Sequence, residues 1–335
     1  MGERLLVATA TELLRIDPET GVVGPTEGLG ERHPVAVVAD PWVANRAWCG
    51  TSRGGVFRSD DGGAHWSATG LDGERLMSLV ASPARRDLLW AGTEPSAVWR
   101  SDDAGKAWHR TSDVAALPSS SEWAFPPRPD THHVRWIACH PADADRLWVA
   151  VEAGALIRTT DGGRSWTDRV DGGPYDTHEL AVHDAAPEVL RVAAGDGFYE
   201  SRDAGDTWTS PMEGLDVSYL RSVAIDPGDA ETVLVSAATH PHAAYVAGRS
   251  DGRLYRRVAD GRWQRVLDGW PEPPRTIAPL LLAGRQGGEQ WAADERGVHR
   301  SQDGGATWSQ VAAFDPVPAH LRGIAAMADP LPGTG

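Results

Sequence analysis

Ser59-Asp60-Asp61-Gly62-Gly63-Ala64-His65-Trp66 is the stretch that decides the fold, because closely similar octapeptides recur along the chain. The other full copies are Ser101–Trp108, Thr159–Trp166, Ser201–Trp208 and Ser301–Trp308, and a shortened copy occupies Ala259–Trp263. The steps between successive tryptophans are 42, 58, 42, 55 and 45 residues. A repeat of this length is typical of one four-stranded propeller blade.

Each copy has the residues of a tight hairpin turn. The Asp carboxylate can accept main-chain N–H groups of the following residues, and the glycine two places later can adopt a positive φ. The Ser or Thr hydroxyl can brace the turn, while the Trp ring can fill the space between neighbouring sheets. Flanking β-prone runs such as Gly55–Arg58 and Ala155–Arg158 make each copy a strand–turn–strand unit.

An apolar strand precedes each hairpin, as in Pro34–Pro41, and its continuous apolar character predicts an innermost strand covered on both faces. Residues 4–24 supply three strands without an inner one, whereas Leu321–Pro330 has the form of an inner strand alone. We therefore predict an all-β fold, a seven-bladed β-propeller closed by pairing of the N- and C-terminal strands. The predicted blades of this single domain, 1–335, are 1–30 with 320–330, 33–70, 75–112, 132–170, 177–213, 219–269 and 275–313.

The composition excludes several classes of protein. With 32 Lys+Arg against 47 Asp+Glu, the net charge of −15 is too negative for a nucleic-acid binder. The longest apolar stretch, Ile277–Ala283, is too short to cross a bilayer, and residues 1–14 have no basic region typical of a secretory signal. We expect a cytoplasmic monomer with no nucleic-acid and no membrane partner.

The octapeptides resemble the Asp-box (BNR) repeats of sialidases, sortilin-type receptors and photosystem II assembly factors, a group with WD40/YVTN-like propellers. The resemblance covers most of the chain from 34 to 313. It implies that the boxes lie on the outer, lower rim and shape the blades without carrying chemistry. Because members of the group do unrelated things, the resemblance indicates the fold and leaves the function open.

Sites in such rings gather on the face where loops enter the inner strands. Counting back from the proline that ends each inner strand gives two sets of positions that point the same way. Eight places before the proline, or its equivalent, lie His33, Arg75, His133, Asp176, Tyr219, Thr276 and Arg322. Six places before it lie Val35, Met77, Arg135, His178, Arg221, Ala278 and Ile324. An insertion within 239–245 adds three residues to the same face, His240, His242 and Tyr245.

These residue types favour a small-molecule enzyme with a site at this mouth, whether lyase, oxygenase or hydrolase. The catalytic candidates are His133, His178, Asp176 and Tyr219. The candidate ligands for a transition metal (Zn, Fe or Cu) are His33, His133, His178, His240 and His242. The candidates for binding a small-molecule or carbohydrate ligand are Arg75, Arg135, Arg221, Arg322, Trp123 and Tyr245. The insertion 113–131 is expected to form a lid over the mouth or a strap between blades.

Two alternatives stay open. In a sialidase-like glycoside hydrolase, the resemblance implies that Arg135, Arg221 and Arg322 grip a sugar carboxylate. Tyr219 would then be the nucleophile, with Glu179 or Asp176 nearby, although the Arg-Ile-Pro motif of those enzymes is missing and they have six blades. The second alternative is a non-catalytic scaffold or assembly factor. Its rigid face would bind a protein partner, and an acidic surface favours a basic one.

Overall fold

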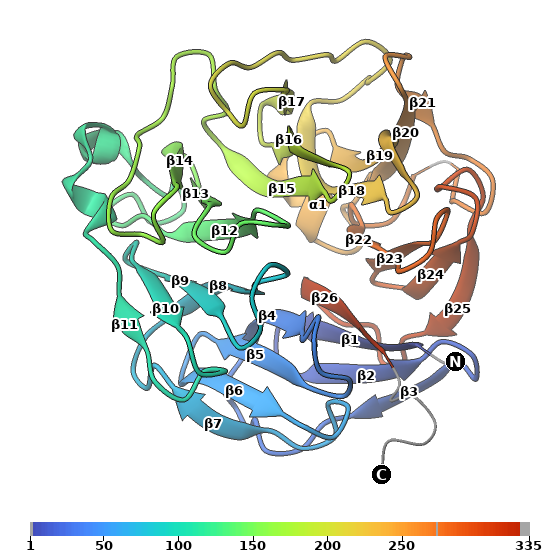
Figure 1. Ribbon diagram of the computed structural model, residues 1–335. Coiled ribbons are helices and arrows are strands. Elements are labelled where there is room, and N and C mark those ends of the chain that lie inside the picture. The colour runs from blue at the N-terminus through green and yellow to red at the C-terminus, as the bar shows by residue number, and fades with distance from the viewer. Residues whose placement is uncertain (1–2, 273, 329–335) are drawn as a thin grey trace.

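The computed structural model describes residues 3–272 and 274–328, which form a ring of seven sheets around one axis (Figure 1). The predicted all-β, seven-bladed propeller is confirmed. Helical structure in the described residues is limited to two 3₁₀ turns, η1 (Val114–Ala116) and η2 (Pro118–Glu122), and one short helix, α1 (Pro241–Tyr245). Residues 1–2, 273 and 329–335 of the predicted domain lie outside the described residues, among them the last two of the predicted closing strand.

Each sheet extends from an innermost strand at the axis to an outermost strand at the rim. In that order, the first three sheets are β26 (Leu321–Ala328), β1 (Glu3–Thr9), β2 (Leu13–Asp17), β3 (Val22–Pro25); β4 (Pro34–Ala39), β5 (Ala47–Thr51), β6 (Gly55–Ser59), β7 (Ser67–Gly70); and β8 (Leu76–Ala81), β9 (Leu89–Thr93), β10 (Val98–Ser101), β11 (His109–Arg110). The next two are β12 (Val134–Cys139), β13 (Leu147–Val151), β14 (Ala155–Thr159); and β15 (Thr177–His183), β16 (Ala186–Ala194), β17 (Gly197–Ser201). The last two are β18 (Tyr219–Asp226), β19 (Asp229–Ala238), β20 (Arg253–Val258), β21 (Gln264–Arg265); and β22 (Leu280–Ala283), β23 (Gln290–Asp294), β24 (Gly297–Ser301), β25 (Ser309–Ala313).

The second strands of the blades form the core. Every residue of β5, β9, β13 and β23 is buried, because neighbouring blades cover both faces of these strands. The second residue of each of these four strands is a fully buried tryptophan, namely Trp48, Trp90, Trp148 and Trp291. These large rings fill the space between blades, and they are four of the 15 tryptophans in the chain.

The octapeptide turns have the hydrogen bonds that their residues allow. In the first copy, Oδ1 of Asp61 accepts the N–H groups of Ala64 and His65, each at 3.0 Å. The hydroxyl of Ser59 donates to Asp61 at 2.8 Å, and the indole N–H of Trp66 donates to the main-chain oxygen of Gly63 at 3.0 Å. The bond from the Ser or Thr hydroxyl to the Asp recurs in the other four full copies, and the indole bond recurs at Trp108 and Trp308.

The ring closes through its two terminal strands. β1 pairs antiparallel with β26, with Leu5 opposite Ala326 and Val7 opposite Ile324. The innermost strand of this blade therefore comes from the far end of the sequence, as predicted (Figure 1). Closure covers the inner edge of β1, so this edge is not free to pair with another chain.

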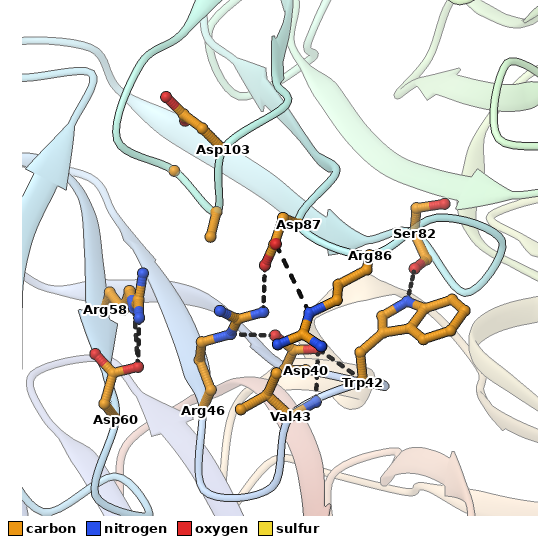
Figure 2. Close-up of polar contacts among 12 residues, drawn as sticks. Asp40, Trp42, Val43, Arg46, Arg58, Asp60, Ser82, Arg86, Asp87 and Asp103 are labelled. Atoms are coloured by element: carbon orange, nitrogen blue, oxygen red, sulfur yellow. Dashed lines mark hydrogen bonds and ion pairs between the residues drawn. The ribbon is translucent and has the colours of Figure 1, made fainter.

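The turns between the first and second strands join one blade to the next (Figure 2). Arg46 precedes β5, and its guanidinium contacts Asp40 of its own blade and Asp87 of the following one. The indole N–H of Trp42 donates to the main-chain oxygen of Ser82 at 3.0 Å, again across the blade boundary. The blades are therefore held together by polar bonds between these turns as well as by apolar packing between sheets.

Candidate functional site

A cavity of about 560 Å³ lies on the axis, and all seven inner strands contribute to its lining. Much of the wall is aliphatic, from residues such as Val37, Leu79 and Leu281. The cavity-lining residues at the position six places before the inner-strand proline are Val35, Met77, Arg135, His178, Arg221 and Ile324. The charged members of this set lie near the start of their strands, so they gather at one mouth of the cavity.

Glu152 is the central acid of this mouth. It directly follows β13, and its Oε2 accepts a hydrogen bond from Nε2 of His133 at 2.8 Å. Nε of Arg135 lies 3.6 Å from the same oxygen. Burial alone would raise the pKa of Glu152, but the His133 bond and the charge of Arg135 outweigh it and lower the pKa to about 2. Its neighbours thus hold a mostly buried carboxylate in the ionised form.

His178 faces two carboxylates. Its Nε2 lies 3.7 Å from Oδ2 of Asp176 and 3.9 Å from Oε1 of Glu152. Its Nδ1 lies 2.6 Å from the main-chain oxygen of Leu220. A carbonyl oxygen only accepts, so Nδ1 carries the proton and Nε2 of the neutral ring has a lone pair. Burial favours that neutral ring by lowering the pKa of His178, and burial also raises the pKa of Asp176.

Tyr219 and Tyr245 lie beside His178. The Tyr219 hydroxyl is 3.4 Å from Nε2 of His178, and Arg135 is 3.4 Å from the Tyr245 hydroxyl. Burial raises the pKa of Tyr219 above its ordinary value. The phenol therefore keeps its proton at neutral pH, which opposes the nucleophilic role that the sialidase hypothesis gives it.

Arg221 is a structural residue in this fold. Its guanidinium donates to the main-chain oxygens of Ala278 at 2.5 Å and Leu321 at 2.7 Å, and the side chain is almost fully buried. It links β18 to β26 and to the segment just before β22, which are far apart in the sequence. These bonds commit Nη1 and Nη2 to main-chain oxygens, whereas the buried Nε has no hydrogen-bond partner among the described residues. A guanidinium bonded in this way does not favour the expected arginine triad.

The other two predicted arginines differ in their pairing. Nε of Arg75 lies 3.2 Å from Oε2 of Glu94, which also binds Arg128. Arg322 lines the cavity, and it has no hydrogen bond or ion pair among residues 3–272 and 274–328. Partial burial lowers the pKa of Arg322, and the positive charges of Arg135 and Arg75 lower it further.

Glu179, the alternative carboxylate of the sialidase hypothesis, also lines the cavity. The hydroxyl of Ser222 donates to its Oε2 at 2.5 Å. Burial raises the pKa of Glu179 to about 8. The side chain is therefore largely protonated at neutral pH.

The five histidines predicted to bind a metal do not form one cluster. Nδ1 of His33 is bonded to the main-chain oxygen of Ala10, in the loop between β1 and β2, at 3.0 Å. His240 caps α1 through its Nδ1, and both His240 and His242 are exposed. His133 is bonded to Glu152. Among the described residues, the group whose ligand atoms are close enough to hold a metal is Glu152, Asp176 and His178.

The insertion 113–131 is tied down at both of its ends. Trp123 is buried in the core beside β12 to β14 and donates its indole N–H to Ser119, so its ring is not the predicted aromatic wall. Phe125 packs edge-on against His133, and Arg128 binds Glu94 through two bonds of 2.9 and 2.6 Å. These contacts connect two blades, which favours the strap over a freely moving lid.

Sequence reasoning missed two carboxylates at the mouth, Glu94 and Glu152. Each directly follows the buried second strand of its blade, β9 or β13. The end of each of these second strands pairs with the start of the inner strand, so the loop that follows opens on the same face. The signal was therefore present, as an acidic residue immediately after five apolar or small ones.

No protein-family model matches the chain. The photosystem II assembly lipoprotein Ycf48 of Picosynechococcus sp. is 24% identical over 179 residues, or 52% of this chain and 48% of that protein. The chain thus matches about half the length of this curated relative. The resemblance to photosystem II assembly factors is confirmed by this similarity.

Solved structures share the fold. A GH74 enzyme from Niastella koreensis superposes with a TM-score of 0.70 at 16% identity, over 92% of this chain and 52% of that chain. Ycf48 bound to D1 peptide superposes with a TM-score of 0.62 at 17% identity, over 98% and 97% of the two chains. At these identities the likeness shows the fold alone. The Ycf48 similarity supports the assembly-factor alternative better than the enzyme.

The expectation of a cytoplasmic location is wrong by this comparison, since the curated relative is a lipoprotein. Within residues 3–272 and 274–328, no helix has the length and apolar character needed to cross a membrane.

Proposed function

We propose that this chain is a non-catalytic assembly factor that binds a segment of a partner protein at the mouth of its axial cavity. Arg322 carries the proposal. Its guanidinium lines the cavity without a hydrogen bond or ion pair from residues 3–272 and 274–328, whereas Arg75 and Arg221 are committed to internal partners. Arg322 is an exposed arginine without an internal partner among the described residues, so its guanidinium is free to bind a carboxylate.

Electrostatics at the mouth support an anionic group on the partner. Positive charges of Arg135 and Arg75 act on Arg322 and disfavour its charged form. A carboxylate bound beside Arg322 would offset this repulsion and form two parallel hydrogen bonds with the guanidinium. This proposal differs from the sequence-based expectation of a basic partner, because it places an acidic group at the mouth.

The cavity also limits the kind of segment that fits. Its aliphatic wall suits apolar side chains, while the net charge of −15 repels a long acidic tract. One carboxylate next to apolar residues satisfies both conditions. We therefore propose an apolar C-terminal segment with a free α-carboxylate. The binding of D1 peptide by Ycf48 is a precedent for a peptide ligand on this fold.

Fluorescence anisotropy with labelled apolar hexapeptides, each as the free acid and as the C-terminal amide, tests the proposal. We expect free acids to bind at least tenfold more tightly than amides, and the Arg322→Glu variant to remove this preference. Arg164→Glu is the matched control, because Arg164 is an exposed arginine on an octapeptide turn. Equal binding of acids and amides, or an unchanged preference in Arg322→Glu, would refute the carboxylate site.

A further inference from the structure

Three acceptor atoms of the described residues converge beside the mouth. They belong to Glu152, Asp176 and His178, each of which offers one ligand atom within 4.8 Å of the other two. The imidazole nitrogen is 3.7 and 3.9 Å from the two carboxylate oxygens. Since Nδ1–H of His178 is donated to Leu220, Nε2 has no proton to offer either carboxylate. The Tyr219 hydroxyl is a distant donor, at 3.4 Å from Nε2.

A second atom of each side chain is already held in place. Oε2 of Glu152 is bonded to His133 at 2.8 Å, Oδ1 of Asp176 accepts the N–H of Ala153 at 3.1 Å, and Nδ1 of His178 is bonded at 2.6 Å. This is the arrangement that metal sites use, in which an outer partner fixes each ligand and a second atom faces the ion. His178 is 2% exposed, so its Nε2, whose one donor among the described residues is the Tyr219 hydroxyl at 3.4 Å, is directed into the group and away from bulk water.

Gly195 leaves room around these atoms. A Cβ at this position would lie 2.0 Å from Oδ2 of Asp176 and 3.4 Å from Cε1 of His178. Any other residue would thus displace the Asp176 carboxylate. The φ of Gly195 is not in the left-handed region. The close approach to Asp176 is therefore the reason that glycine suits this position.

We propose that Glu152, Asp176 and His178 bind a divalent first-row transition metal ion, with Zn²⁺ or Mn²⁺ as the best fit. Bonds of about 2.0 to 2.2 Å place two ligands of one ion at most about 4.4 Å apart, and the measured 3.7 and 3.9 Å lie below that limit. The imidazole nitrogen favours a transition metal over Mg²⁺ or Ca²⁺, which prefer oxygen. This site is separate from the carboxylate site at Arg322, and neither depends on the other.

Isothermal titration of tag-free, chelator-treated protein with Zn²⁺ and with Mn²⁺ tests the site. We expect one equivalent of Zn²⁺ to bind. The Asp176→Asn substitution should weaken the affinity for Zn²⁺ about a hundredfold, since Asn keeps the bond to Ala153 but loses the charge. Gly195→Ala should weaken it at least tenfold by moving the Asp176 carboxylate. The matched control is His242→Ala, which removes an exposed histidine outside the group and should bind as the wild type does.

Two results would overturn the proposal. One is the lack of a stoichiometric Zn²⁺ or Mn²⁺ isotherm with wild-type protein. The other is equal binding by wild type and a folded Asp176→Asn variant, which would place the ion elsewhere. Circular dichroism and thermal melting of each variant distinguish loss of the site from loss of the fold. If Asp176→Asn fails to fold, the metal affinities of Gly195→Ala and His242→Ala still show whether the ion binds at this group or at the exposed histidines.

Discussion

Arg46 and Asp87 lie in neighbouring blades, and a contact of 2.5 Å between Nη2 and Oδ1 joins the β4–β5 turn to the β8–β9 turn (Figure 2). The same guanidinium binds Asp40, whose carboxylate is almost fully buried. The N–H groups of Trp42 and Val43 also donate to Asp40, at 2.7 and 3.1 Å. Arg46 therefore both neutralises a buried acid and links two sheets.

Arg46→Ala is expected to destabilise the protein strongly. It leaves the buried Asp40 without its counter-ion, which costs about 3 kcal/mol of unfolding free energy. Urea unfolding followed by tryptophan fluorescence measures the change. Arg58→Ala is the control, because Arg58 pairs with the exposed Asp60 and should cost less than about 1 kcal/mol. Equal effects of the two substitutions would contradict the assignment.

The octapeptide turns predict a loss of stability in acid. Hydrogen bonds from Ser165 and Thr207 are the largest causes that lower the pKa values of Asp161 and Asp203 to about 2, from an ordinary 3.8. Because the pKa of these carboxyl groups is lower in the folded protein than in the unfolded chain, their ionised form stabilises the fold above about pH 4. This stabilisation is lost as the pH falls toward 2. The double variant Asp161→Asn, Asp203→Asn should show a shallower fall of Tm between pH 5 and 2. Identical slopes for variant and wild type would refute this.

Glu3 predicts the opposite dependence on pH. Burial, together with the charge of Glu289, raises its pKa from 4.5 to about 7. Folding then favours the protonated form of Glu3. The contribution of this form to the stability of the folded protein is fully present below pH 4.5 and is lost as the pH rises through 7. Glu3→Gln keeps an acceptor for the Trp291 indole, now 3.0 Å from Oε2. Its Tm should match wild type at pH 4 and exceed it by a few degrees at pH 8, whereas Glu12→Gln, at an exposed position, should change neither.

Alanine substitutions at Gly28 and Gly73 distinguish the cost of a steric clash from the cost of backbone strain. Both have positive φ, +95° and +87°, but a Cβ on Gly28 would lie 2.1 Å from the main-chain oxygen of Trp66, whereas Gly73 faces open space. Gly73→Ala should therefore cost only the left-handed conformation, about 1–2 kcal/mol. Gly28→Ala must also move the turn that contains Trp66, so we expect at least about 3 kcal/mol. Chemical unfolding of both variants measures the difference, and equal costs would show that the turn shifts freely.

The fold could be predicted because its decisive information is local and repeated. Each octapeptide specifies one hairpin through bonds among residues at most four places apart, such as those of Ser59 and Asp61. The terminal closure followed from counting strands. Alternation along the inner strands also predicted which positions line the cavity, including Arg135 and His178.

The site was harder to predict because its bonds cross between blades. Arg221 is bonded to Ala278 and Leu321, which are 57 and 100 residues away, and no local pattern shows that these bonds occupy its guanidinium. The directions of His240 and His242 depend on how α1 sits in its loop, where His240 caps the helix. The sequence therefore predicted which residues lie on the face with the cavity mouth. It did not predict which of their side chains are free to bind a ligand.

β26 has a consequence for how the protein is made. It carries Arg322 and is synthesised after all the other described strands, yet it is the innermost strand of the sheet that begins with β1. During translation, β1 to β3 are without β26, the innermost strand of their sheet, until the other six blades have emerged from the ribosome. A nascent chain that stops short of β26 thus has neither a complete ring nor the arginine proposed to recognise the partner, so it cannot engage that partner prematurely.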